Sequence, residues 1–197
     1  MLASCVRRRY RRDEIVFHEG DPGDCLFLLD RGRAAVRVTS PVGDTVILAL
    51  LGPGDMFGEQ ALLADDHIRF ATVAALEHLE VRCLHRDRFA ELRERHTGVD
   101  RLLIAALDAR ARRLTQELLE ALYVPAETRV LRRLLSAARL YGTAPVPLTQ
   151  EELANLAGTT RPTTNRALRK AEEAGVLRLG RGSVEILDRG RLDRLAH

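Results

Sequence analysis

The sequence predicts an α+β fold in three successive parts: a β jelly roll, one long helix and a winged helix-turn-helix. Three observations support this prediction. Short apolar runs alternate with turn clusters from residue 14 to residue 84, an unbroken helical pattern covers 99–122, and two amphipathic segments meet at a glycine within 148–177. We place the domains at 1–97 for the roll, 98–124 for the long helix and its hinge, and 125–197 for the helix-turn-helix.

Six apolar runs in the first part predict strands. They cover residues 15–17, 25–29, 34–38, 46–51, 70–76 and 79–84. The segments between them are rich in Gly, Pro and Asp, the residues that tight turns favour. Strands of this length at spacings of about ten residues are typical of a sandwich or barrel, and their number fits a jelly roll. A helix over 86–95 should follow, with Phe89 and Leu92 facing inward.

The longest helical pattern contains no Gly or Pro and carries one apolar stripe. The residues of this stripe are Leu103, Leu107, Ala111, Leu114, Leu118 and Leu122. We expect the stripe to pair with a second copy in a two-stranded coiled coil, because a helix-turn-helix usually reads two half-sites as a two-fold dimer. The alternative is a helix that packs wholly on its own domain. Residues 123–125, Tyr-Val-Pro, should break the helix and form a hinge.

A further amphipathic helix over 126–141 and a turn over 142–147 lead into the helix-turn-helix. Its first helix opens with Thr149 and Glu152, a capping box in which each side chain satisfies a free backbone N–H group. Gly158 can take the left-handed conformation that ends a helix.

The second helix should begin at Thr160, with Pro162 in its first turn, where a missing N–H group costs little. Its inward face is spaced as a helix requires and consists of Thr164, Ala167, Leu168 and Ala171. The apolar runs 176–179 and 183–187 then predict a β-hairpin wing. Two ordinary core helices in a bundle are the alternative interpretation of this stretch.

Charge and composition narrow the function. Residues 125–197 contain 13 Arg and Lys against 8 Asp and Glu, whereas the whole chain contains 31 against 28, so positive charge concentrates in the helix-turn-helix part. A phosphate-binding surface needs such a concentration. No apolar run approaches the roughly 18 residues of a membrane span, and the first residues lack the apolar segment of a secretory signal, so we expect a cytoplasmic protein. The three cysteines are widely spaced, which argues against a disulfide framework or a CxxC metal site.

The order of roll, long helix and winged helix-turn-helix, together with three motifs, resembles that of the CRP/FNR family of bacterial transcription regulators. The motifs are EGDPGD at 19–24, GPGDMFGEQALL at 52–63 and RFATV at 69–73, and the resemblance covers nearly the whole chain. It implies a roll like a cyclic nucleotide-binding domain and a homodimer that binds a palindromic, TGTGA-like DNA site. It also implies a partner in RNA polymerase, since the exposed turn 141–147 lies where family activators touch it. We expect an activator, with a repressor as the alternative.

The resemblance also implies which residues contact DNA. Arg161 and Arg166 match the two family arginines that read guanines in each half-site. Pro162 stands where the family commonly has a Glu that accepts from a cytosine amino group, so Thr163 or Asn165 should take over that contact or it is lost. Residues at helix starts that suit phosphate contacts are Thr149, Gln150 and Thr160.

A family effector site maps onto one segment of the roll and onto the long helix. The residues concerned are Gly58, Glu59, Gln60, Ala61, Arg69, Phe70, Glu117 and Leu118. In cyclic nucleotide-binding members the Glu holds the ribose and the Arg, followed by a small hydroxyl residue, holds the phosphate. Phe70 replaces that hydroxyl and should fill the phosphate end, while Glu117 and Leu118 replace hydroxyls that touch adenine.

We therefore expect Glu59 and Arg69 to form a structural ion pair, with no cofactor required and DNA binding without an effector. Binding of cyclic AMP, or of another small ligand, is the alternative. The three cysteines are too few for the family's iron–sulfur cluster, and no His stands out as a haem ligand. The chain also lacks the His-x-His pair that a cupin-type metal enzyme needs, so we expect no enzyme. A pure protein-interaction module remains the other rival.

Overall fold

A computed structural model of the chain describes residues 5–41, 43–142 and 145–197. The chain divides into two compact units, Met1–Arg112 and Arg113–His197. The division falls within the long helix α3, Gly98–Tyr123, whose first part belongs to one unit and whose last part belongs to the other.

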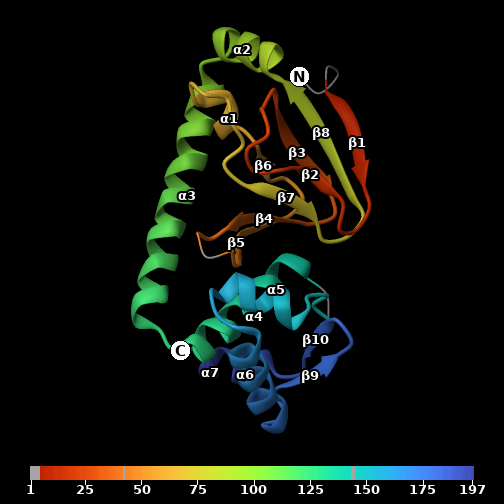
Figure 1. The fold of residues 1–197 in the computed structure, drawn as a ribbon, viewed down its shortest axis with the longest axis vertical. Helices are drawn as coiled ribbons and strands as arrows, with labels where there is room; N and C mark the ends of the chain where they lie inside the picture. The colour runs from red at the N-terminus through yellow and green to blue at the C-terminus, as the bar shows by residue number, and fades with distance from the viewer. Residues whose placement is uncertain (1–4, 42, 143–144) are drawn as a thin grey trace. The chain divides into compact units, whose positions relative to one another are not determined.

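The first unit is a roll of two four-stranded antiparallel sheets, as predicted (Figure 1). One sheet has the strand order β1-β8-β3-β6, and the other has the order β2-β7-β4-β5. The strands are β1 Val6–Tyr10, β2 Ile15–Phe17, β3 Cys25–Arg31, β4 Ala34–Thr39, β5 Thr45–Leu51, β6 Met56–Phe57, β7 Thr72–Ala75 and β8 Leu79–His85. All six predicted strands occur, and no strand end lies more than two residues from its predicted position.

Alternating side chains of both sheets form the core of the roll. Three aromatic rings lie together there, with ring centroids 5.2 Å apart for Phe27 and Phe57 and 5.7 Å apart for Phe17 and Phe27. Leu29 and Val81 from one sheet and Val73 from the other are almost fully buried in the same cluster. The apolar periodicity that predicted the strands therefore marks the residues that the two sheets bury between them.

Two short strands and two short helices were not predicted from the sequence. They are β1, β6, α1 (Gln60–Leu63) and α7 (Arg189–Leu195). Strand β1 reads VRRRY and is almost entirely exposed, because it lies at a sheet edge and pairs with β8 alone. Its three arginines carry no apolar alternation, so only its backbone pairing with β8 makes it a strand.

Helix α2, Arg86–Arg95, has the predicted bounds, and the start of α3 joins it on the roll. Leu103 of α3 is buried in a cluster with Leu26, Leu84 and Phe89. The expectation that Leu103 belongs to the dimer stripe is therefore wrong, since its side chain packs within its own unit. Leu107 is half-buried, and the later members of the predicted stripe are exposed.

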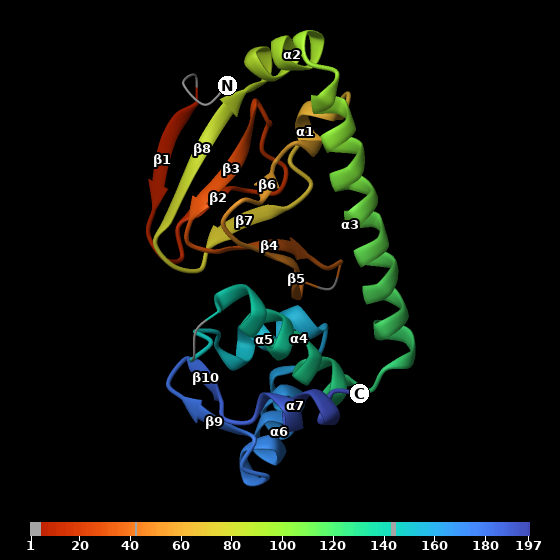
Figure 2. The same ribbon diagram turned by 180° about the vertical axis from the view of Figure 1, so that it is seen from behind.

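The second unit contains the helix-turn-helix and its wing (Figure 2). Its elements are α4 Ala126–Tyr141, α5 Gln150–Ala157, α6 Arg161–Glu173, the hairpin of β9 Leu177–Gly180 and β10 Ser183–Ile186, and α7. Helix α4 packs against α5, α6 and α7, with Val130 and Leu134 fully buried. The predicted helices and the wing are confirmed, while residues 143 and 144 of the predicted turn lie outside the described residues.

The break predicted at 123–125 separates α3 from α4, and arginines of α4 tie the two helices together. The Arg129 guanidinium donates to the carbonyl oxygens of Val124 at 2.8 Å and Ala157 at 3.1 Å, and also to those of Ala121 and Gly158. Arg132 and Arg133 each pair with Glu120 at 3.1 Å. These contacts hold the end of α3 against α4 and the end of α5 within the second unit. Within the described ranges, the structure contains no helix long and apolar enough to cross a membrane.

Candidate nucleic-acid interface and effector site

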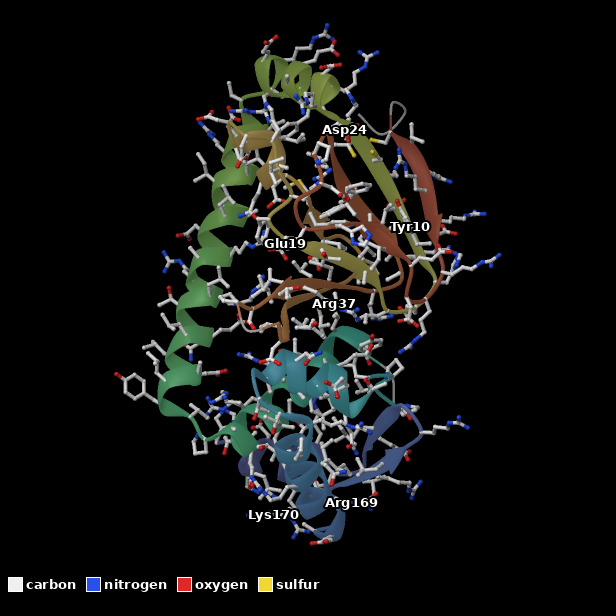
Figure 3. All side chains as sticks on the ribbon, viewed as in Figure 1. Tyr10, Glu19, Asp24, Arg37, Arg169 and Lys170 are labelled. Carbon is white, nitrogen blue, oxygen red and sulfur yellow. The ribbon has the colours of Figure 1, made fainter. Side chains whose placement is uncertain are left out.

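Helix α6 has one buried face and one exposed face. Its N-cap is Thr160, whose side chain accepts a hydrogen bond from the backbone N–H of Thr163, and Pro162 lies in the first turn. The four predicted inward residues are all buried, namely Thr164, Ala167, Leu168 and Ala171. This burial leaves Arg161 and Arg166 exposed, and Arg169 and Lys170 lie further along the same helix (Figure 3).

Helix α5 presents its N-terminus beside α6. Thr149 and Glu152 form the predicted capping box, and Gly158 ends the helix with φ 58°. The Asn165 Nδ2 group of α6 donates to Gln150 Oε1 of α5 at 3.0 Å. The two helix starts are therefore joined by a side-chain hydrogen bond.

A groove of about 600 Å³ brings several predicted residues together. Thr149, Gln150, Arg161 and Asn165 line it, together with Gly182 and Ser183 of the wing. Free N–H groups at a helix start and an exposed arginine both favour an anion. The groove can therefore take a phosphate group of a nucleic-acid backbone.

Arg166 lies on the exposed face of α6 and has a partner that the sequence did not suggest. Its Nε atom donates to Glu127 Oε1 of α4 at 2.6 Å. The two residues are 39 positions apart, so no local spacing pattern could have paired them. Arg161, by contrast, has no recorded hydrogen bond or ion pair within the part of the chain that the structure describes.

In the roll, the Arg69 side chain is only 4% exposed. Its guanidinium donates to the carbonyl oxygens of Gly58 and Cys25, each at 2.7 Å, and lies 4.3 Å from the centre of the Phe17 ring. Gly58 has φ 80°, and a Cβ at this position would lie 2.6 Å from Arg69 Nη1. Glycine is therefore required at position 58, both for its backbone conformation and for the approach of the guanidinium.

Glu59 is also buried, and its partner is Arg110 of α3 rather than Arg69. Arg110 Nη1 lies 3.3 Å from Glu59 Oε1. The predicted ion pair between Glu59 and Arg69 is thus wrong, because Arg69 is turned toward backbone carbonyls. The sequence analysis missed Arg110 because it lies 51 residues from Glu59, and the two residues meet only in the folded roll.

The three replacements expected to close the site do not fill the interior of the roll. Phe70 is 45% exposed, with the Arg110 guanidinium 5.2 Å from the centre of its ring, so it does not fill the interior. Glu117 Oε1 lies 3.8 Å from Arg133 Nη1, both in the second unit. Leu118 is exposed. The expectation that Phe70 fills the phosphate end of the pocket is therefore wrong, because its ring is exposed.

Three polar atoms of the predicted effector segment are buried without a hydrogen-bond partner. They are Glu59 Oε2, Gln60 Oε1 and Arg69 Nε. A buried polar atom that lacks a partner costs free energy, and such atoms mark places where a ligand or water binds. Ala61, the remaining predicted residue, is buried in α1 and lies close to Gly23. No group of three or more His, Cys, Asp or Glu side chains is arranged for a metal ion among the described residues.

Large apolar side chains on α3 are exposed in the single chain. Ile104 is 67% exposed, Leu118 59% and Leu122 65%, with Leu114 beside them at 42%. Positions 104, 111, 118 and 122 are spaced so that they share one face of a helix. Ile104 thus takes the place at the start of the stripe that the sequence had given to Leu103.

Comparisons with known proteins agree with both units. The family of cyclic nucleotide-binding domains matches residues 7–96, and the family of Crp-like helix-turn-helix domains matches 128–195. The chain is 38% identical to the cyclic AMP receptor protein of Thermus thermophilus, over 99% of this chain and 90% of that protein. It is 31% identical to a CRP-like cAMP-activated global transcriptional regulator of Mycobacterium tuberculosis, over 95% of this chain and 86% of the relative.

Solved structures show the same fold. FixK2 from Bradyrhizobium japonicum aligns with a TM-score of 0.84 at 24% identity, over 97% of this chain and 96% of that one. The catabolite activator protein of Thermus thermophilus aligns with a TM-score of 0.56 at 37% identity, over 99% of this chain and 91% of that one.

The environment of Glu117 gives a prediction about stability. Burial raises the pKa of its carboxyl above the ordinary value, against the lowering effect of Arg133 and Arg113 and with a further rise from Glu120. The folded state therefore binds this proton more tightly than the unfolded state, so stability falls as pH rises through the folded pKa. We expect Glu117→Gln to raise the melting temperature relative to the parent at pH 8, and the difference to shrink toward pH 4.

Thermal unfolding followed by circular dichroism at both pH values measures this difference. Glu94→Gln, on the exposed surface of α2, is the matched control and should change the melting temperature little at either pH. A Glu117→Gln variant that is less stable than the parent at pH 8 would show that the pair with Arg133 outweighs the burial.

Proposed function

The chain belongs to the CRP/FNR family of DNA-binding transcription regulators, and from this premise we propose that it acts as a homodimer on a palindromic, TGTGA-like site. The regulators of this family are not enzymes. The observation that carries the proposal is the exposed face of α6, where Arg161 and Arg166 stand five positions apart on a helix whose other face is fully buried. Arginines in this position suit bidentate contacts to the O6 and N7 atoms of guanine.

The groove beside α6 supports contacts to the phosphate groups of the DNA backbone, next to the base contacts. Thr149, Gln150 and Thr160 stand at the starts of α5 and α6, where phosphate oxygens accept from free N–H groups. Thr163 and Asn165 already bond Thr160 and Gln150 within the chain. We therefore expect the base pair opposite Pro162 to be read weakly, because proline offers no acceptor and its neighbours are engaged.

The exposed stripe of α3 supports the dimer. Ile104, Leu118 and Leu122 are each more than half exposed. Exposed apolar surface of this kind marks an interaction site, and pairing with a second copy would bury it. Two recognition helices related by a two-fold axis would then enter successive major grooves about 34 Å apart. An activator of this kind would also contact RNA polymerase. The turn over 141–147 was expected to be exposed for this contact, but Tyr141 and Val146 are buried, so they do not form that surface.

A cyclic nucleotide-dependent form of this regulator is the second candidate, and one observation favours it. Glu59 Oε2 and Gln60 Oε1, at the start of α1, and Arg69 Nε, in the loop between α1 and β7, are buried without hydrogen-bond partners. A carboxylate and an amide oxygen suit the hydroxyl groups of a ribose, and a guanidinium suits a phosphate. These residues fit such a ligand, and relatives of this chain are described as cAMP-activated. Glu59 would bind the sugar and Arg69 the phosphate.

Selection from a randomised duplex pool, with and without cyclic AMP at one salt concentration, tests both candidates. The regulator should select one palindrome, and its affinity should fall steeply with salt because phosphate contacts release counterions. Enrichment only with cyclic AMP supports the nucleotide-dependent form. Enrichment of the same site in both conditions supports a protein that needs no effector, and no enrichment in either would refute the DNA-binding role.

Replacing Arg161 by alanine should weaken binding to the selected site by roughly 1–3 kcal/mol and relax the preference at one base pair, because a bidentate guanine contact is lost. Competition binding against all four bases at that position measures the effect. Arg194→Ala removes the same charge from the exposed side of α7 and should leave the preference unchanged. If Arg161→Ala keeps the parent's base preference, Arg161 does not read a base.

Placing a charge in the stripe should separate the dimer. Leu118→Asp puts a carboxylate on the face that we expect to be buried between two copies of α3, where an unpaired charge is costly. Sedimentation velocity should then show a monomer at concentrations where the parent is a dimer. Leu195→Asp, at a similarly exposed leucine of α7, should remain dimeric. If the Leu118→Asp variant is still a dimer, this face of α3 does not form the dimer interface.

A further inference from the structure

The contact between Arg166 and Glu127 assigns a role to a residue outside the predicted DNA-contacting set. Arg166 Nε donates to Glu127 Oε1 at 2.6 Å, and both side chains are accessible. From this geometry we propose that Glu127 is a positioning residue that sets specificity, because it holds Arg166 in the orientation that reads guanine. The inference rests on the proposed function, in which Arg166 contacts a base.

The atoms used in this contact leave the reading edge of Arg166 available. A guanidinium is a planar fork, and only its Nε group bonds Glu127. The terminal Nη1 and Nη2 groups have no recorded partner in the described portion of the chain. These two groups can donate side by side to the O6 and N7 atoms of guanine. The ion pair and a base contact are thus compatible, and the pair need not break when DNA binds.

Glu127 is itself held in place relative to α6. It lies in the first turn of α4, where the helix dipole stabilises a carboxylate. Two residues later, Arg129 binds the carbonyl oxygens of Ala157 and Gly158, which end α5 directly before the turn into α6. The start of α4 and the turn are therefore joined, so the carboxylate stands at a defined position beside the recognition helix.

Holding Arg166 in this way favours the specific complex over non-specific ones. An arginine that is already oriented loses less side-chain entropy when it binds a base. The Glu127 carboxylate also repels nearby phosphate groups and neutralises part of the charge of Arg166, which weakens sequence-independent attraction to DNA. Both effects raise the ratio of specific to non-specific affinity.

The test compares Glu127→Ala and Glu127→Gln with the parent, on the selected palindrome and on a scrambled duplex at one salt concentration. Glu127→Ala should lose about three- to tenfold in affinity for the palindrome, while its affinity for the scrambled duplex stays equal or rises. Glu127→Gln keeps an oxygen that can accept from Nε, so its affinity for the palindrome should lie between those of the parent and the alanine variant. The intermediate value would not be expected if Glu127 acted through its charge alone.

Glu173→Ala is the matched control, since it removes one carboxylate from an exposed position of α6 that has no recorded partner in the described structure. It should leave the ratio of the two affinities unchanged. In an Arg166→Ala background, Glu127→Ala should have little further effect on the palindrome, because the residue it positions is absent. Equal effects of Glu127→Ala in both backgrounds would overturn the inference, as would tighter binding of Glu127→Ala to the palindrome, which would make Glu127 a competitor of DNA.

Failure of the inference can be told apart from failure of the proposed function. If Arg166→Ala keeps the parent's base preference, then Arg166 does not read a base, and the assignment of Glu127 fails with it. If Arg166→Ala relaxes the preference at one base pair while Glu127→Ala does not change the ratio of affinities, the DNA-reading role of Arg166 stands and the inference about Glu127 alone is refuted.

Discussion

Four backbone carbonyl oxygens converge on the guanidinium of Arg129, and the geometry of the DNA-binding unit depends on this contact. Two of the carbonyls belong to Ala121 and Val124 at the end of α3, and two belong to Ala157 and Gly158 at the end of α5. Carbonyls at the C-terminus of a helix lack partners within that helix, so one guanidinium satisfies the ends of two helices at once. The end of the long helix and the turn of the helix-turn-helix are therefore fixed to the same residue of α4.

Carboxylates decide which arginines of this Arg-rich unit remain available for an anion. Arg132 and Arg133 are held by Glu120, and Arg169 pairs with Glu172 on its own helix at 3.1 Å. Arg161 has no such partner within the described ranges. Arg166 bonds Glu127 through Nε only, so its Nη1 and Nη2 groups remain available to donate. A count of positive charges therefore overstates the binding surface, because pairing removes some arginines from it and orients others.

Local sequence patterns predicted the local structure, but they could not predict contacts between residues far apart in the sequence. The capping box at Thr149, the turn at Gly158 and the buried face of α6 all follow from spacings of a few residues, and all are confirmed. Strand β1 and the partners of Glu59, Arg69 and Arg166 depend on residues brought together by folding. On α3, the later leucines of the predicted stripe are exposed, whereas the burial of Leu103 on the roll could not be predicted from the helical period alone.

Arg110 links the predicted effector segment to α3 within the first unit. It pairs with Glu59 at 3.3 Å and lies over the exposed ring of Phe70, while Glu59 Oε2 remains buried without a hydrogen-bond partner. A ligand that bonded Glu59 would satisfy the buried oxygen and would either share the carboxylate with Arg110 or displace it. Displacement would change the contacts that hold α3 on the roll, whereas sharing would strengthen them. Either change would alter the free energy of the helix that carries the apolar stripe, so a ligand at Glu59 and a partner helix on α3 would be thermodynamically linked.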